Sequence, residues 1–269
     1  MIILKELIDK GIATPPQFVE TSMHMLMKMG STAYGTASKD SDTDLYGVCI
    51  PPKEILFPHL AGYIVGYDLE YPRFDHYQQQ HLKLNNNEYD LNIYNIIKYF
   101  RLCADNNPNL IDSLFVPDDC ILYLSPIGKL IRDNRRLFLS KKCWHTYKGY
   151  AYQQLHKMRT KGNNAGAKRH ELFKKYGYNT KYAYHLVRLL MQAEQILEFG
   201  DMDLRGNSQL LREIKGGEWS VTQVEDFFNS RQGSLQGLYK SSNKIPDKPR
   251  EKEIKELLIR ILKSANVLD

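Results

Sequence analysis

The sequence lacks the features that define several classes of protein. No stretch approaches the roughly 20 consecutive apolar residues that a membrane span needs, and Lys5 and Glu6 interrupt the N-terminal run with no apolar segment behind them. Only four cysteines occur among 269 residues, and none has the Cys-x-x-Cys spacing of a zinc or redox site. The chain also has no internal repeat. We therefore expect a cytoplasmic globular protein with no membrane contact and with buried free thiols.

Acidic side chains are scarce in one part of the chain. Residues 1–125 contain 9 basic and 16 acidic side chains, whereas residues 126–269 contain 28 basic and 15 acidic ones. Within residues 126–188 the net charge is +14, because only Asp133 and Glu171 oppose 16 basic residues. Such a surface attracts polyphosphate or nucleic acid, although a set of solvated lysine-rich helices would have the same composition.

The first half of the chain has a mixed pattern of apolar residues. It predicts an opening helix over 2–10 and short strands over 22–29, 45–50 and 88–94, although a helix would also tolerate the methionines of 22–29. The polar segment 58–88, rich in Tyr, Gln, Asn and His, shows little periodicity and is interpreted as an irregular insertion. This half is therefore predicted to form a sheet with accompanying helices.

Helical patterns dominate the second half. Helices are expected over 92–104, 137–158, 181–199 and 251–265, with others opened by Ser125-Pro126 and by the capping box Ser220-x-x-Gln223. Helix 181–199 is the clearest, with Asn179 or Thr180 as its N-cap and Gly200 as its stop. The sequence thus predicts an α+β fold, with one domain over 1–125 and a basic, mostly α-helical domain over 126–269.

Two aspartates stand at the start of a predicted strand. Asp42 and Asp44 are two residues apart, so their carboxylates leave one face and repel each other unless a cation lies between them. Upstream, Gly30-Ser31 has the composition of a phosphate-binding turn, in which glycine allows close approach and serine supplies donors. Eleven residues separate Ser31 from Asp42, a distance that fits a loop and short helix leading back to the strand.

These motifs resemble the signature of the DNA polymerase beta superfamily of nucleotidyltransferases. The closer similarity is to the RNA-repair-pathway polymerase beta family of bacteria and phages, carried by Gly30-Ser31-Thr32-Ala33-Tyr34-Gly35, Ser41-Asp42-Thr43-Asp44 and Glu88-Tyr89-Asp90-Leu91. The resemblance covers roughly residues 20–200 and is strongest over 29–48. It implies a polymerase-beta-like domain at the N-terminus, in which Gly30, Ser31, Tyr34 and Gly35 bind the nucleotide.

The resemblance also implies a third metal-binding carboxylate, Asp90, on a strand adjacent to that of Asp42 and Asp44. Two Mg²⁺ ions, or Mn²⁺ in their place, would be held by these three catalytic aspartates, with an NTP, ATP in preference, as the donor. Asp90 would then act as general base or position one. Glu88, two residues earlier on the same face, is the alternative third carboxylate. Asp90 could also be an ordinary solvent-exposed carboxylate at the end of a strand.

Two further sets of residues are candidates for binding phosphate. Lys181, His185, Arg188 and Gln192 share one polar stripe of the predicted helix 181–199, which would face the nucleotide or simply face solvent. Four other basic residues lie among Phe173, Tyr176 and Tyr178 and would contact single-stranded RNA, although such aromatics also pack within their own domain. These four are Lys168, Arg169, Lys174 and Lys175.

The expected reaction is transfer of NMP from an NTP to an acceptor hydroxyl, with release of pyrophosphate. RNA, including a tRNA end, is the favoured acceptor, because the +14 segment suits a polyanion and the resemblance concerns RNA repair. Two alternatives remain open: nucleotide transfer to a protein hydroxyl, as in an antitoxin-like modifier, and a catalytically silent nucleic-acid-binding module. The oligomeric state is not indicated by the sequence.

Overall fold

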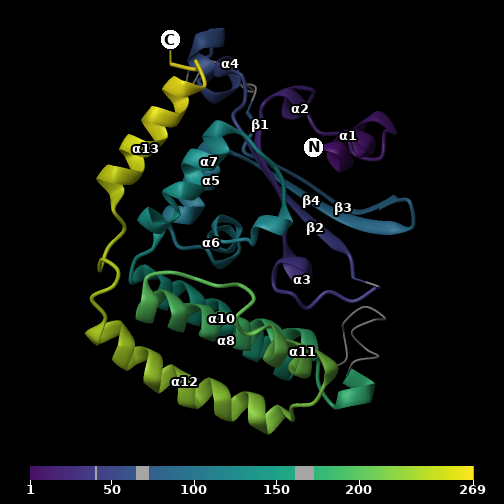
Figure 1. Cartoon of the computed structure of the whole chain (residues 1–269), viewed down its shortest axis with the longest axis vertical. Helices are drawn as coiled ribbons and strands as arrows, with labels where there is room; N and C mark the ends of the chain where they lie inside the picture. Colours follow the sequence, from purple (N-terminus) through teal and green to yellow (C-terminus); the bar gives the residue numbers. More distant parts are fainter. Residues whose placement is uncertain (40, 65–72, 161–172, 269) are drawn as a thin grey trace.

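A computed structural model of the chain describes residues 1–39, 41–64, 73–160 and 173–268. Its centre is a five-stranded mixed sheet in the order β3-β4-β2-β1-β5 (Figure 1). The strands are β1 (Met23–Lys28), β2 (Thr43–Cys49), β3 (His76–Leu84), β4 (Asn87–Asn95) and β5 (Ile121–Leu124). β2 and β4 pair in parallel, and the other neighbours pair antiparallel. Because β2 and β4 run in the same direction, the chain must cross over between them. β3 belongs to this connection and pairs with β4 at one edge of the sheet.

The alternating side chains of β1 divide the core between the two faces of the sheet. Met25 and Met27 point to the face covered by the large helical core, whereas Leu26 points to a smaller cluster that includes Leu4 and Leu7 of α1 (Ile2–Asp9). All five side chains are almost fully buried. The methionine at every second position thus reflects a strand whose two faces are both covered.

Short helices surround the sheet and connect its strands. They are α2 (Phe18–Thr21), α3 (Gly30–Ala33), α4 (Lys53–Leu56), α5 (Ile96–Ala104) and α6 (Pro108–Leu114), with 3-10 turns at Pro58–Ala61, Asp118–Cys120 and Arg135–Phe138. α3 directly follows β1 and contacts β2. This short helix therefore places residues 30–33 at the end of the sheet where β2 begins.

Every element described after β5 is helical. These elements are α7 (Pro126–Asp133), α8 (Lys142–Thr160), α10 (Thr180–Phe199), α11 (Ser208–Gly216), α12 (Val221–Ser241) and α13 (Glu251–Ser264). α8, α10 and α12 pack together as a layer beside the sheet, and α13 returns to pack on α5 and α7 (Figure 1). One hydrophobic cluster runs from β1 through α10 to α13, so the helical part and the sheet share a core.

The structure confirms the α+β fold class and most of the expected elements. Helix α10 begins after Asn179, whose side chain accepts a hydrogen bond from the Lys181 backbone at 3.0 Å, and it ends at Gly200 with a φ of 65°. The capping box of Ser220 and Gln223 is present at the start of α12. These helix ends could be predicted from the sequence because each depends on one or two local residues.

Two expectations about the first half were wrong. Segment 58–88 is not irregular throughout, because His76–Leu84 forms β3 and pairs with β4 through a turn at Asn85 and Asn86, both with positive φ. Only Leu82 and Leu84 of this edge strand are buried, so the sequence shows no clear alternation of apolar and polar residues there. The helix expected over 92–104 begins at Ile96, since residues 92–95 complete β4.

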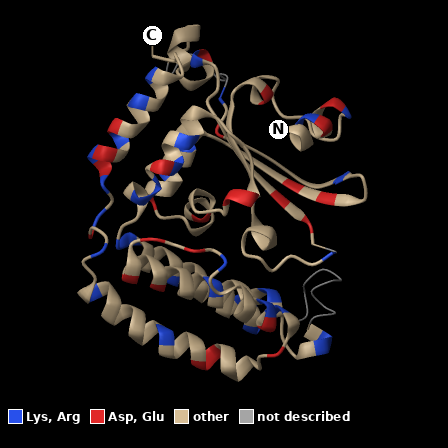
Figure 2. Cartoon of the chain, in the orientation of Figure 1, with Lys and Arg blue, Asp and Glu red and all other residues tan. Residues whose placement is uncertain are grey.

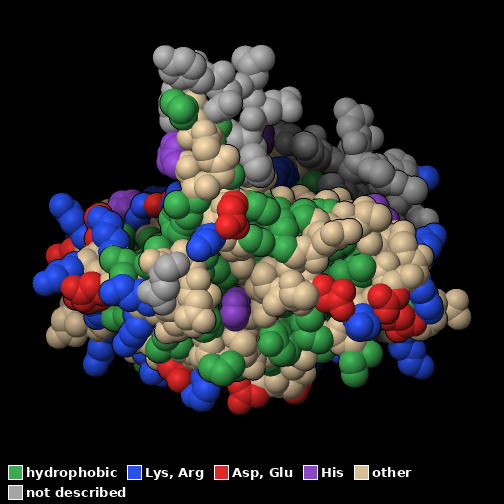
Figure 3. Space-filling model, turned by 90° about the horizontal axis from the view of Figure 1, so that it is seen from above, with side chains coloured by type: hydrophobic (Ala, Val, Ile, Leu, Met, Phe, Trp, Pro, Cys, Tyr) green, Lys and Arg blue, Asp and Glu red, His purple; other side chains and the backbone are tan. Residues whose placement is uncertain are grey.

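Charge is unevenly distributed over the molecule. Acidic residues lie along the ends of the central strands near α3, and basic residues are concentrated at the neighbouring end of the helical layer (Figure 2). On the face viewed in Figure 3, by contrast, acidic and basic side chains mix around the rim and apolar side chains occupy much of the middle. Across the described residues, the helices are all too short or too polar to span a bilayer.

Candidate active site

Asp44 and Asp90 are register partners on the two parallel strands of the sheet. β2 and β4 pair residue for residue from Thr43 opposite Tyr89 onward, so Asp44 lies directly opposite Asp90. Paired positions on adjacent strands are about 4.8 Å apart and direct their side chains to the same face. Asp42 precedes β2 by one residue and is exposed. The fold thus brings two of the predicted carboxylates together and places the third beside them.

The electrostatics of Asp44 reflect this crowding of like charges. The pKa of Asp44 is raised to about 6. Burial is the largest cause, and the neighbouring carboxylates of Asp42 and Asp90 also raise it. Lys181 and Arg188 oppose the shift but do not cancel it. In the absence of a cation, the carboxyl group of Asp44 therefore holds its proton to higher pH than an ordinary aspartate.

Gly30 packs directly against the Asp44 carboxylate. It adopts a φ of +57°, which glycine tolerates and other residues rarely adopt, and a Cβ at this position would overlap the Asp44 side chain. The backbone N–H of Met29 donates to the Asp44 carbonyl at 2.7 Å. The turn and the carboxylate therefore form one unit, in which the backbone of residue 30 can approach anything that Asp44 binds.

The residues after Gly30 form a compact turn that ends at Thr36. Ser31 is half-buried, and its carbonyl accepts the backbone N–H of Thr36 at 2.8 Å. Gly35 has a φ of +67°, and the Thr36 hydroxyl lies 3.1 Å from the hydroxyl of Tyr184 on α10. The turn is thus fixed to the helical layer as well as to β2.

An irregularity in β3 orients the carboxylate of Asp90. The register of β3 and β4 shifts between Gln79 and Leu82, and His81 within that bulge has a φ of 58°. Its backbone N–H donates to Asp90 Oδ1 at 2.9 Å, and its ring Nδ1 lies 2.5 Å from Glu88 Oε1. Glu88 is therefore engaged with His81, while Asp90 is the carboxylate in register with Asp44. The bulge was not expected from the sequence.

Tyr34 and Arg188 belong to a buried polar cluster rather than to the surface. The Arg188 guanidinium donates to the Tyr34 hydroxyl and lies 3.3 Å from Asp112 Oδ2, while the Tyr34 hydroxyl donates to the same carboxylate. The guanidinium carbon also lies 4.4 Å from the centre of the Tyr34 ring. This cluster connects α3, α6 and α10 behind Asp44. Sequence reasoning missed Asp112, although a lone carboxylate within the apolar helix Pro108–Leu114 was a signal.

The polar stripe expected on α10 is divided by the fold. Lys181 is exposed in the first turn of the helix and His185 is half-buried, whereas Arg188 and Gln192 are buried at 7% and 3% exposure. The stripe is therefore not an ordinary solvated face. Lys181 is the member that lies open to solvent within electrostatic range of Asp44.

The structure describes only part of the expected RNA-binding set. Lys174 and Lys175 are exposed on a short helical turn, and the Lys175 ammonium lies 4.9 Å from the centre of the Tyr176 ring. Tyr178 is buried and donates its hydroxyl to the Trp219 carbonyl at 2.6 Å, so it packs within its own domain. Lys168 and Arg169 lie outside the described residues.

Asp42, Asp44 and Asp90 are the residues that could hold Mg²⁺. Within the described ranges, no three His, Cys, Asp or Glu side chains already form a group that could hold a metal ion by themselves. Mg²⁺ at phosphoryl-transfer sites takes one or two carboxylates and completes its octahedron with phosphate oxygens and water. Burial and the neighbouring carboxylates of Asp42 and Asp90 together raise the pKa of Asp44. The carboxylates therefore fit a cation that enters together with a polyphosphate.

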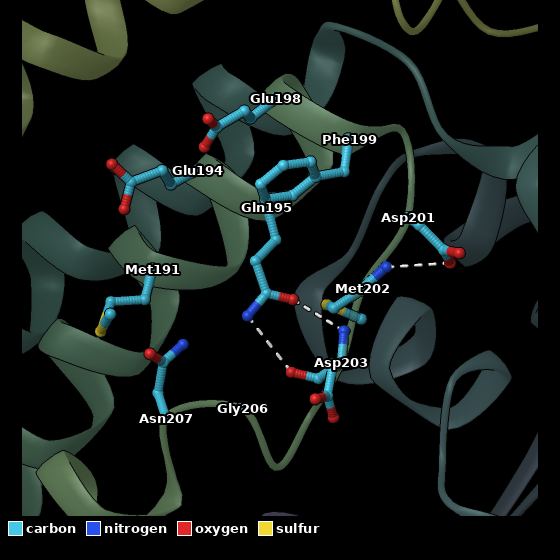
Figure 4. Close-up of a pocket in the computed structure, with 10 residues that line it drawn as sticks. All are labelled: Met191, Glu194, Gln195, Glu198, Phe199, Asp201, Met202, Asp203, Gly206 and Asn207. Carbon is cyan, nitrogen blue, oxygen red and sulfur yellow. Dashed lines mark hydrogen bonds between the residues drawn. The ribbon is translucent and has the colours of Figure 1, made fainter.

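A separate cavity of about 490 Å³ lies at the other end of α10. Its lining includes Met191, Glu194 and Phe199 of that helix and Asp203 of the following loop (Figure 4). The Gln195 side chain spans it by bonding the Asp203 backbone at 2.7 and 3.2 Å. Lys181 and Phe199 are about 27 Å apart along the helix. The cavity contains none of the predicted site residues.

A glycine turn packed on a strand aspartate, with a second aspartate in register on the parallel neighbour, is the arrangement that the motif resemblance predicts for a nucleotidyltransferase of the polymerase beta type. The chain belongs to the RNA repair pathway DNA polymerase beta family, whose model matches residues 19–257. The resemblance found in the motifs around Gly30 and Asp44 is thereby confirmed. It extends beyond residue 200, where the sequence alone offered no assignment.

Two individual proteins are also similar to this chain. One is an uncharacterised 38.9 kDa protein of Enterobacteria phage T4 from the nrdC–mobD intergenic region, 29% identical over 152 residues. That match covers 52% of this chain and 40% of the phage protein, so the chain matches less than half the length of this relative. The other is the crystal structure of a nucleotidyltransferase-like protein from Exiguobacterium sibiricum, with a TM-score of 0.31 and 11% identity, covering 97% of this chain and 78% of that one.

Proposed function

We propose that this protein transfers a nucleoside monophosphate from an NTP to a hydroxyl group of RNA, with Mg²⁺ held by Asp42, Asp44 and Asp90. The observation that carries the proposal is the register of Asp44 with Asp90, together with the packing of Gly30 on the Asp44 carboxylate. Family membership supports nucleotidyl transfer in general. The particular donor, acceptor and metal are the proposed part.

In the proposed reaction the acceptor oxygen forms a bond to the α-phosphorus of the NTP. The bond from that phosphorus to the bridging oxygen of the β-phosphate breaks, and pyrophosphate leaves with its electron pair. Bound Mg²⁺ would supply the positive charge that offsets the negative charge on the phosphates. Asp90 would accept the proton of the hydroxyl, and the His81 backbone N–H would keep its carboxylate in place.

Gly30 and Ser31 would bind the triphosphate in this scheme. The positive φ of Gly30 turns the backbone toward Asp44 without a side chain in the way, so that backbone N–H groups and the Ser31 hydroxyl can donate to phosphate oxygens. Tyr34 would act indirectly, because its hydroxyl is occupied by Asp112 and Arg188. Its role would be to hold the turn against α10.

The RNA acceptor is supported by charge and by the family. The basic end of the helical layer neighbours the acidic ends of β2 and β4 (Figure 2), so a polyanion bound on the helices would present its terminus to the carboxylates. The family is described by an RNA repair pathway.

The test is to incubate the protein with each α-labelled NTP, Mg²⁺ and either total RNA or lysate protein, and to identify the labelled macromolecule. We expect label in RNA, its loss with Asp44→Asn, and normal labelling with Asp133→Asn, whose carboxylate forms an exposed ion pair with Lys129. Label in protein alone would overturn the RNA acceptor. Equal labelling by wild type and Asp44→Asn would overturn the assignment of the site.

A further inference from the structure

Helix α11 and the loop before it bring three cations to α3 and the turn that follows it. Each of them donates a hydrogen bond to a backbone carbonyl of residues 32–36, at distances of 3.5, 2.6 and 3.0 Å; the pairs are Arg205 with Thr32, Arg212 with Gly35, and Lys215 with Thr36. α11 and the loop before it lie about 175 residues beyond the turn in sequence. No local pattern in the sequence therefore predicts that these cations contact the residues that follow Gly30.

Lys215 differs from the two arginines in what its other donors contact. Arg205 also binds Asp119 at 2.9 Å, and Arg212 also binds Gln209 at 3.2 Å. For Lys215, the bond to Thr36 is the only side-chain hydrogen bond within the described part of the chain. An ammonium group has three donors, so two remain for a ligand. The side chain is half-buried and cannot swing freely into solvent.

Lys181 lies beside Lys215 because α10 and α11 are joined at this point. The Thr180 hydroxyl donates to the Lys215 carbonyl at 3.3 Å, which fixes the start of α10 to the end of α11. Lys181 is within electrostatic range of Lys215 and of Asp44, and Lys215 is within range of Asp42. Neither lysine forms an ion pair with a carboxylate of the described residues. Two ammonium groups thus stand next to the acidic cluster without neutralising it.

Each half of this arrangement lacks the opposite charge. On the basic side, burial and the charge of Lys181 lower the pKa of Lys215. On the acidic side, Asp44 and Asp90 are register partners on β2 and β4, and Asp42 directly precedes β2. A ligand that carries a divalent cation and several phosphate charges would place positive charge beside the carboxylates and negative charge beside the lysines.

We infer that Lys215, together with Lys181, forms the wall of the site that binds the terminal phosphates of the NTP. The inference deepens the proposed function and rests on it for the identity of the ligand. The two lysines stand within electrostatic range of the carboxylates that would share the cation, so the phosphate bound here is one attached to that cation. A phosphate of the RNA backbone is the competing occupant, and the experiment distinguishes the two.

The experiment measures binding of inorganic tripolyphosphate, with and without Mg²⁺, by titration calorimetry. Lys215→Met should weaken binding at least tenfold, the loss expected for one charge-assisted hydrogen bond. Lys215→Arg should retain most of the affinity, since it keeps the charge. Lys252→Met, a substitution on the exposed surface of α13, is the matched control and should bind as wild type does. Unchanged affinity in Lys215→Met would overturn the inference.

Two further measurements are the salt dependence of tripolyphosphate binding and the affinity for a short single-stranded RNA. If Lys215→Met acts only by shifting the turn through loss of the Thr36 bond, the salt dependence of tripolyphosphate binding should stay as in wild type. If the substitution removes a phosphate ligand, that salt dependence should become shallower. If Lys215→Met instead weakens binding of a short single-stranded RNA and leaves tripolyphosphate untouched, the wall binds RNA and the inference is wrong. If tripolyphosphate binding depends on Lys215 but no label is transferred to any acceptor, the proposed function fails and the phosphate wall stands.

Discussion

Arg188 and Asp112 form an ion pair in the interior, with Arg188 Nη1 3.3 Å from Asp112 Oδ2 and side-chain exposures of 7% and 0%. The pair joins α10 to α6, and Tyr34 joins it to the turn after α3. Burial raises the pKa of Asp112, and the charge of Arg188 opposes that shift. The helical layer thus holds the turn beside Asp44 through a buried charge pair.

Breaking this pair on one side should be costly. Arg188→Met leaves the Asp112 carboxylate buried without its cation, and we expect the free energy of unfolding to fall by about 3–5 kcal/mol. Urea denaturation followed by circular dichroism measures the loss. A drop of less than about 1 kcal/mol would show that the two side chains are not coupled.

The double variant Arg188→Met/Asp112→Leu separates stability from function. Apolar replacement of both partners removes the desolvation cost, so stability should return close to that of wild type. Tyr34 loses both of its partners in this variant, and NMP transfer should remain impaired. A double variant that is both stable and fully active would show that the cluster only stabilises the fold.

The extent to which this site could be predicted depends on how far apart its residues lie in sequence. Gly30, Ser31, Asp42 and Asp44 fall within one short segment, and the strand and turn that carry them follow local patterns. The burial of Arg188 could not be predicted, because its partner Asp112 lies 76 residues away in the sequence. Lys215 reaches the turn through the packing of α11 against α10 and the turn, 179 residues from its partner Thr36 in sequence.

The edge strand β3 escaped prediction for a different reason. An edge strand has one neighbour and one partly solvated face, so most of its side chains are polar and its alternation is weak. The turn at Asn85 and Asn86 was the available signal, since consecutive asparagines tolerate the positive φ that a tight hairpin requires. The bulge at His81 depends on tertiary pairing and has no comparable mark in the sequence.

Asp44→Asn should change how stability depends on pH in the metal-free protein. The pKa of Asp44 is about 6 in the fold, against about 3.9 for an unfolded aspartate, so the fold favours the protonated form. A raised carboxyl pKa contributes stability that is fully present below the unfolded pKa and is lost as pH rises through 6. Relative to Asp44→Asn, the wild type should therefore lose up to about 3 kcal/mol between pH 4 and pH 7.

Urea denaturation in EDTA across that range measures the difference between the two proteins. Asp133→Asn is the control, because that carboxylate is exposed and paired with Lys129. Parallel stability profiles for wild type and Asp44→Asn would contradict the crowding of Asp42, Asp44 and Asp90. Added Mg²⁺ with an NTP should reduce the difference, since the cation offsets the repulsion.

Gly30→Ala should abolish NMP transfer. The new Cβ would overlap the Asp44 carboxylate and force the turn or the carboxylate to move, in addition to the strain of a positive φ. Gly11→Ala is the matched control, because Gly11 has a φ of +65° but open space around its Cβ position. Both variants should lose about 1 kcal/mol of stability from the backbone, and Gly30→Ala alone should lose activity. Activity in Gly30→Ala near that of wild type would exclude close packing on Asp44.

Binding of single-stranded RNA should depend on salt and on the exposed Lys174 and Lys175. Each phosphate contact releases counterions, so the logarithm of affinity should fall with the logarithm of salt by about 0.7 per contact, and Lys174→Glu/Lys175→Glu should reduce that slope by about 1.4. NTP binding should survive, because neither lysine is among the residues proposed to bind the NTP. The control is Lys252→Glu/Lys263→Glu on α13, which changes the net charge equally. Weak, salt-independent RNA binding in both variants and in wild type would leave a protein or small-molecule hydroxyl as the acceptor.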